Sequence, residues 1–96
     1  MSKQYKIWRY GLNITDTQTI PMQKNAKIMS VAMMECGLCI WVRVENDSRI
    51  PNVDRGIIIH GTGHMLLEPD VPFIGTVIDN RMSLPLVWHV FDGGEI

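Results

Sequence analysis

The amino-acid sequence predicts a small all-β domain, a sandwich or partly open barrel of six or seven short antiparallel strands. Almost every apolar run is short, rich in β-branched or aromatic residues, and bounded by glycine, proline or asparagine. Hydrophobic residues make up 46% of the chain and charged residues 20%, which is the composition of a folded globular protein. A chain of 96 residues cannot form a second core, so residues 1–96 are predicted to be a single β domain.

The first third of the chain predicts two strands and one ambiguous run. Residues 5–10 alternate basic with apolar or aromatic side chains, as a first strand would. Residues 17–20 predict a brief second strand, which Pro21 restricts to a sheet edge or a strand end because proline lacks an N–H donor. Ala26 to Met34 is apolar on both alternating faces. A strand buried on both sides fits this run, and a short helix capped by Gly37 fits it as well.

The clearest predicted strand is Leu38 to Val44. Its side chains alternate with the period of two, with Leu38, Ile40, Val42 and Val44 on one face and Cys39, Trp41 and Arg43 on the other. Cys36 and Gly37 are expected to form the hairpin turn before it. Residues 45–54, rich in Asn, Asp, Ser and Pro, are predicted to form the longest polar loop.

Three further strands complete the predicted sheet structure. Residues 57–59 indicate a buried strand that runs into a glycine-containing loop at 60–64. Residues 73–78 form the next expected strand, and residues 84–91 close the fold. Pro85 is tolerated near the start of this last strand, where no N–H is needed for the ladder.

Charge and hydropathy argue against several protein classes. The net charge is −1 and the pI about 6.2, so the chain lacks the basic surplus that neutralises phosphate backbones, and nucleic-acid binding is not expected. Residues 1–48 hold six basic and four acidic groups, whereas residues 49–96 hold three and six. No apolar run approaches the roughly 18 residues of a membrane span, and a signal peptide pattern is absent. We therefore expect a cytoplasmic protein without membrane contact.

Two cysteines and two histidines have the local spacings of a zinc site. Cys36 and Cys39 are followed by His60 and His64, which resembles a two-Cys, two-His pattern. Residues 40–59 between the pairs are longer than the usual spacer and are patterned as strand. On a strand, an odd spacing places two cysteines on opposite faces. Two ordinary thiols are the favoured interpretation, so neither a metal nor a cofactor is predicted.

The loop His60-Gly61-Thr62-Gly63-His64 is the candidate ligand-binding site. Its glycines let backbone N–H groups point at an anion without a Cβ in the way, and its histidines add donors. A tight surface turn between two strands would contain the same residues. If a small anionic ligand binds, we expect it here, and more tightly in mild acid because imidazole gains charge there.

Four ring-bearing residues are candidates for subunit contacts: Trp8, Trp41, Trp88 and His89. Seven Met and three Trp exceed what one small core hides, so a homo-oligomer is predicted, with a dimer as the base choice. His89 shares a predicted face with Val87 and Phe91, which favours a hydrogen-bonded core or interface histidine. The tryptophans could stack nucleic-acid bases, but basic neighbours are too few to favour that over core or subunit contacts.

Catalytic motifs are absent from the sequence. No Gly-x-Ser-x-Gly elbow, Walker loop or His-Glu-x-x-His helix positions a serine, aspartate or histidine for nucleophilic, phosphoryl or metal chemistry. The protein is therefore not expected to be an enzyme.

Five segments carry a family resemblance: Tyr5 to Tyr10, Leu38 to Trp41, Gly61 to His64, Phe73 to Val77, and Val87 to Phe91. With these motifs the chain resembles, over nearly its whole length, a family of short bacteriophage proteins of unknown function. The shared motifs are structural rather than catalytic, so no functional residue is transferred. The resemblance implies a phage genome, expression in the host bacterial cytoplasm, and a small accessory role.

These expectations favour a non-enzymatic phage accessory protein that binds and inhibits a host factor. The target would be a defence protein, in an anti-CRISPR-like role, or a nucleic-acid-processing protein. One alternative is an oligomeric binder, or sponge, for a signalling nucleotide, with the glycine-histidine loop and a tryptophan forming its pocket. The other alternative is a minor virion or assembly protein.

Overall fold

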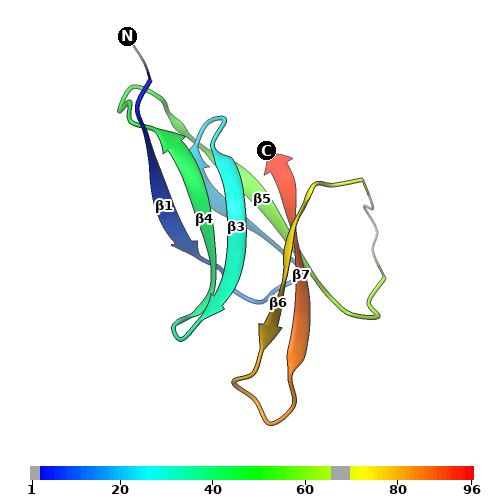
Figure 1. Ribbon diagram of the computed structural model, residues 1–96. Coiled ribbons are helices and arrows are strands. Elements are labelled where there is room, and N and C mark those ends of the chain that lie inside the picture. Colours follow the sequence, from blue (N-terminus) through cyan, green and yellow to red (C-terminus); the bar gives the residue numbers. More distant parts are fainter. Residues whose placement is uncertain (1–2, 66–69) are drawn as a thin grey trace.

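The computed structural model describes residues 3–65 and 70–96, and these residues form seven strands and no helix (Figure 1). The strands are β1 (Tyr5–Gly11), β2 (Thr17–Gln23), β3 (Lys27–Met34), β4 (Gly37–Glu45), β5 (Asn52–Gly61), β6 (Phe73–Asp79) and β7 (Leu86–Glu95). The all-β prediction is confirmed, and the ambiguous run from Ala26 to Met34 is a strand. Within the described ranges, no helix is long and apolar enough to cross a membrane.

The strands form two antiparallel sheets, one of three strands in the order β1-β4-β3 and one of four in the order β2-β5-β7-β6. In Figure 1 the three-stranded sheet lies in front of β2 and β5, with β3 next to β6. The chain crosses between the sheets after β1, after β2, after β4, and never closes into a barrel. The domain is therefore an open two-layer sandwich whose two outer surfaces face solvent.

The core lies between the two sheets and follows the alternation predicted for residues 38–44. Leu38, Ile40, Val42 and Val44 of β4 are all buried against the four-stranded sheet. That sheet contributes Met22, Ile57, Ile59 and Val90, of which all but Ile59 are fully enclosed. Because side chains alternate across a strand, the residues between these core positions point to the outer surfaces.

Two predicted turns differ from the structure. The expected polar loop at 45–54 is shorter, because Asn52–Asp54 begin β5 and pair with β2. The turn before β4 is formed by Glu35 and Cys36, and Gly37, with a φ of 124°, already belongs to the strand. Pairing with the distant strand β2 sets the start of β5, which a local pattern of polar residues does not record, whereas Gly37 pairs with Met34 across the hairpin. Pro21 lies on β2, an edge strand of its sheet, as predicted.

The two sheets approach each other closely where β6 meets β3. A Cβ at Gly75 would lie 2.9 Å from Cγ1 of Val31, a distance that real Cβ contacts essentially never show. Glycine at this position therefore lets β6 pack against the three-stranded sheet. The register of β6 on β7 also shifts here, between Phe73 and Gly75.

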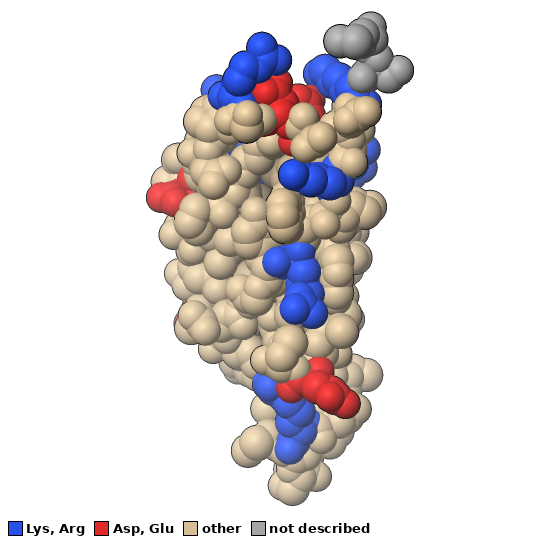
Figure 2. Space-filling view, turned by 90° about the vertical axis from the view of Figure 1, so that its left-hand side faces the viewer, with Lys and Arg blue, Asp and Glu red and all other residues tan. Residues whose placement is uncertain are grey.

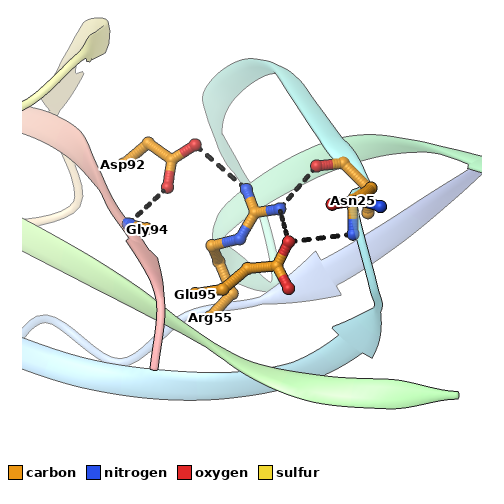
Figure 3. A network of polar contacts seen from close by, with 6 residues as sticks. Asn25, Arg55, Asp92, Gly94 and Glu95 are labelled. Carbon is orange, nitrogen blue, oxygen red and sulfur yellow. Dashed lines mark hydrogen bonds and ion pairs between the residues drawn. The ribbon is translucent and has the colours of Figure 1, made fainter.

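Arg55, a buried arginine, ties the four-stranded sheet to the turn between β2 and β3 (Figure 3). Its Nη1 donates to Asp92 Oδ2 at 3.0 Å, and its Nη2 donates to the carbonyl of Ala26 at 2.6 Å. Glu95 lies 4.0 Å from the same Nη2 and accepts a hydrogen bond from the Asn25 N–H at 3.0 Å. The network joins β5, β7 and the turn, so its role is structural.

Candidate functional site

The predicted ligand loop is a tight turn at the end of β5. Thr62 and Gly63 form the turn, and the His64 N–H donates to the carbonyl of Gly61 at 3.1 Å. Gly63 has a φ of 89°, in the left-handed region that favours glycine. A Cβ at Gly61 would lie 3.0 Å from Cε1 of His64 and 3.3 Å from Cζ3 of Trp88. The missing side chain thus lets the His64 imidazole pack beside Trp88, while the backbone N–H of His64 is used within the turn.

Two histidines lie side by side on the outer surface of the four-stranded sheet. His60 of β5 pairs directly with His89 of β7. Both ring nitrogens of His89 have partners, since Nε2 lies 2.8 Å from Thr62 Oγ1 and Nδ1 lies 2.9 Å from Thr76 Oγ1. The prediction of a hydrogen-bonded His89 is confirmed, but its ring is half-buried on the outer surface and not in the core. The edge of His60 also contacts Phe91, with ring centroids 5.9 Å apart.

Cross-strand pairing arranges this outer surface in rows. The first row contains Thr17, Ile58, Phe91 and Phe73, the second His60, His89 and Thr76, and the third Val87 and Ile78. We call these residues the uncharged face, because no aspartate, glutamate, lysine or arginine is among them. Phe73 is 58% exposed and Ile78 56% exposed. Sequence reasoning missed these apolar residues as site candidates, because only the register reveals that they are neighbours.

A hollow of about 250 Å³ adjoins one end of the uncharged face. Its lining includes Thr19, Gly56, Ile58, Gly93 and Ile96. The two glycines approach closely, since a Cβ at Gly93 would lie 3.1 Å from the backbone of Gly56. Ile96 beside them is 80% exposed. The hollow exists because glycines occupy both strands, and its chemistry suits an apolar side chain from another molecule.

The two cysteines lie together, but the two histidines of the hypothetical zinc site are elsewhere. Cys36 Sγ and Cys39 Sγ are 4.0 Å apart at the turn between β3 and β4. Burial raises the pKa of the Cys39 thiol, and the hydrogen bond with Cys36 adds to the effect. His60 lies on β5 of the other sheet, and His64 lies in the turn after that strand. Across residues 3–65 and 70–96, no group of three or more Cys, His, Asp or Glu side chains could hold a metal ion.

The four predicted interface residues point in different directions. Trp88 packs against the core and its indole N–H has no partner among the described residues, whereas the neighbouring His89 points outward. Trp8 pairs with Val42 and shares the inner side of its sheet, although at the open edge it is 50% exposed. Trp41 lies on the outer side of the same sheet. No single surface contains all four residues.

A family model covers almost the whole of this fold. The model is that of a domain of unknown function, DUF7352, and it matches residues 3–95. The chain belongs to the DUF7352 family. The match extends from β1 to the end of β7, so the family domain and the seven-stranded sandwich are the same unit. Neither a curated protein nor a solved structure matches the chain.

Proposed function

We propose that this DUF7352 protein is a non-enzymatic phage accessory protein that binds a host protein through its uncharged face and thereby inhibits it. The uncharged face is the observation that carries the proposal. Its rows combine aromatic, aliphatic and threonine side chains with a pair of histidines. Depletion of charge and enrichment in aromatic residues distinguish the centre of a protein interface from the rest of a protein surface.

The exposed side chains on this face provide the driving force for binding. Phe73 contacts Phe91 with ring centroids 5.4 Å apart, and Ile78, on the far side of the histidine row, adds a second exposed apolar side chain. Burying one side chain of this size contributes about 1.5–3 kcal/mol. A partner that covers Phe73 and Ile78 and fills the hollow beside Ile96 would recover several such contributions. Exposed apolar side chains set among polar ones mark sites of protein association.

Three of the groups that could perform chemistry, Asp79, Asp92 and His89, are engaged in structural contacts. Asp79 is held by Arg81 at 2.9 Å, and Asp92 by Arg55 at 3.0 Å. Both nitrogens of His89 are bound by threonine hydroxyls. These pairings support a protein that acts by binding rather than by catalysis.

A site-specific crosslinking experiment tests the proposed interface. A photo-crosslinking residue placed at Phe73 should capture one host protein from bacterial lysate, and the purified chain should then inhibit that protein. The matched control carries the same probe at Arg49, whose side chain is 89% exposed on the loop between β4 and β5. Equal capture from both positions, or capture of a virion protein from infected cells, would contradict the proposal.

The predicted homodimer is tested with the same protein. Light scattering at high micromolar concentration should give about twice the 11.0 kDa of one chain. If the probe at Phe73 crosslinks the purified chain to itself and captures no host protein, the uncharged face is a subunit contact. The host-binding proposal would then be wrong.

A signalling-nucleotide binder is the second candidate function. The observation that favours it is the contact of His64 with Gly61 beside Trp88, which places an exposed imidazole next to an indole ring. Calorimetry with a cyclic dinucleotide should show binding that weakens in His60→Ala and His64→Ala, and is tighter at pH 6 than at pH 8. If both variants bind the probe as the wild type does, the loop is only a turn.

A further inference from the structure

The outer surface of the three-stranded sheet gathers cations and aromatic rings that are far apart in the sequence. Cross-strand pairing builds one row from Ile7, Arg43 and Lys27, and the next from Arg9, Trp41 and Ser30. We call these six residues, with Tyr5 and Met29 at their margins, the basic face. Figure 2, which looks onto the β1 side, shows lysine and arginine side chains along the length of the molecule, with acidic groups near the top, on the left flank and in the lower part.

The cations of the basic face have no carboxylate partners among the described residues. The ion pairs of residues 3–65 and 70–96 engage Lys3, Arg49, Arg55 and Arg81, and none involves Arg9, Lys27 or Arg43. Glu45, which continues β4 beyond Arg43, is paired with Lys3 at 3.0 Å. The positive charge of this surface is therefore available to a ligand.

The net charge of −1 averages over two unlike sheets and does not describe this surface. Four of the ten carboxylates, Asp54, Asp79, Asp92 and Glu95, belong to strands of the four-stranded sheet. Packed sheets lie about 10 Å apart. Because the Debye length is about 8 Å at physiological ionic strength, those carboxylates are largely screened from a ligand on the basic face.

Between the two rows lies a shallow, open hollow of about 400 Å³, lined by Ile7, Met29, Ser30 and Trp41. Arg43 stands at its side, with its guanidinium 4.9 Å from the centre of the Tyr5 ring. A second hollow, of about 320 Å³, lies on the other side of Tyr5 and Arg43, where Lys24 also borders it. The first hollow is apolar and the second is polar, with Glu45 also in its lining, and Arg43 stands between them.

We propose that the basic face binds single-stranded nucleic acid, an activity beyond the proposed contact with a host protein. A base would stack on Trp41 in the first hollow, and phosphates would lie against Arg9, Lys27 and Arg43. The alternation of hollow and cation matches the alternation of base and phosphate in a polynucleotide. An acidic peptide would use the cations but not the aromatic hollow, and a duplex would keep its bases stacked away from Trp41. The hollow is too open to enclose a free nucleotide, so the polymer is the occupant.

Fluorescence anisotropy of a labelled oligothymidylate with the full chain tests this proposal. Three neutralised phosphates give a slope of log K against log salt of about −2, so affinity should fall about 20-fold between 50 and 200 mM salt. Labelled duplex of the same length and labelled polyglutamate should bind at least about tenfold more weakly, because neither offers an unstacked base to Trp41. Equal binding of polyglutamate would mean an acidic-protein surface and would overturn the proposal, as would failure to bind oligothymidylate.

Four variants locate the site. Arg43→Gln should weaken binding and reduce the salt slope by about 0.7, whereas Arg49→Gln, a cation off the basic face, should change neither. Trp41→Ala should weaken binding at least about fivefold with the salt slope retained, and Trp41→Phe should restore most of the affinity. If Arg49→Gln and Arg43→Gln have the same effect, binding is non-specific attraction to any cation and the site is wrong. Circular dichroism confirms that each variant is folded.

Discussion

The two outer surfaces of the sandwich are built in the same way and present opposite chemistry. Each is a set of rows in which cross-strand partners from two to four strands lie side by side. On the three-stranded sheet both central rows contain a cation next to an apolar or aromatic residue. On the four-stranded sheet the corresponding rows contain no lysine or arginine. Similar strands can therefore display different surfaces, because register decides which side chains become neighbours.

Both faces belong to one folded domain, which the Arg55 network helps to hold together. Of the variants described here, Arg55→Ala should lower the stability of that domain the most. Arg55→Ala would leave the Asp92 carboxylate and the Ala26 carbonyl without their partner. Removing one member of a buried pair costs about 3 kcal/mol, so the urea midpoint should fall sharply and both faces should lose binding together. Arg49→Ala, which removes an exposed pair, should leave the midpoint unchanged. A variant that retained wild-type stability would show that the turn and the sheet are held independently.

The spacing between the layers provides the next test. Gly75→Ala forces a Cβ against Val31 Cγ1, and overpacking of this kind costs about 1–2 kcal/mol. Val31→Ala removes the opposing methyl groups, so the double variant should recover part of the loss. Chemical denaturation of the two single variants and the double variant measures the coupling. Additive losses would mean that β6 does not pack on β3 as the structure shows.

Changing the charge of one face at a time tests the two proposed binding activities separately, with little loss of stability. Ile78→Lys places a cation on the uncharged face, and Ile7→Glu places an anion on the basic face. Both side chains are more than half exposed, so each change should alter stability by less than about 0.5 kcal/mol. Ile78→Lys should abolish protein capture and leave oligothymidylate binding unchanged, and Ile7→Glu should do the reverse. Loss of both activities in either variant would show that the faces are not independent.

The smallest expected effect on stability is the loss of the Asp79 contribution in acid, at the end of β6. A side-chain hydrogen bond from Arg81 holds the pKa of Asp79 below its ordinary value. A carboxylate with a lowered pKa in the folded state stabilises the fold above its unfolded pKa of about 3.9, and this contribution is lost as the pH falls through the folded pKa. Asp79→Asn should therefore be slightly less stable than wild type at neutral pH, and the difference should shrink progressively as the pH falls below about 4. Thermal unfolding across pH measures this, and a constant difference would exclude the charge as the cause.

The sequence predicted where the strands lie better than it predicted which strands and side chains lie next to one another. Alternation in β4 identified which of its side chains enter the core, and Pro21 identified an edge strand, because both signals are local. Arg55 gave no such signal, since its partner Asp92 lies 37 residues away. The basic and uncharged faces were missed for the same reason. Each row combines strands whose register is fixed by packing across the whole domain, and the net charge conceals their difference.

The order of the strands also determines how the domain can fold. Among the seven described strands, β3-β4 and β6-β7 are the pairs of consecutive strands. The other pairs, β1-β4, β2-β5 and β5-β7, join strands that are further apart in the sequence. Closing such long loops costs chain entropy before the strand contacts form. All-β domains therefore fold slowly, in milliseconds to seconds. During that interval β2 is an unpaired strand, and Pro21 removes one of the N–H donors to which another chain could add. The proline that marks a sheet edge in the native fold thus also protects the nascent chain from misassociation.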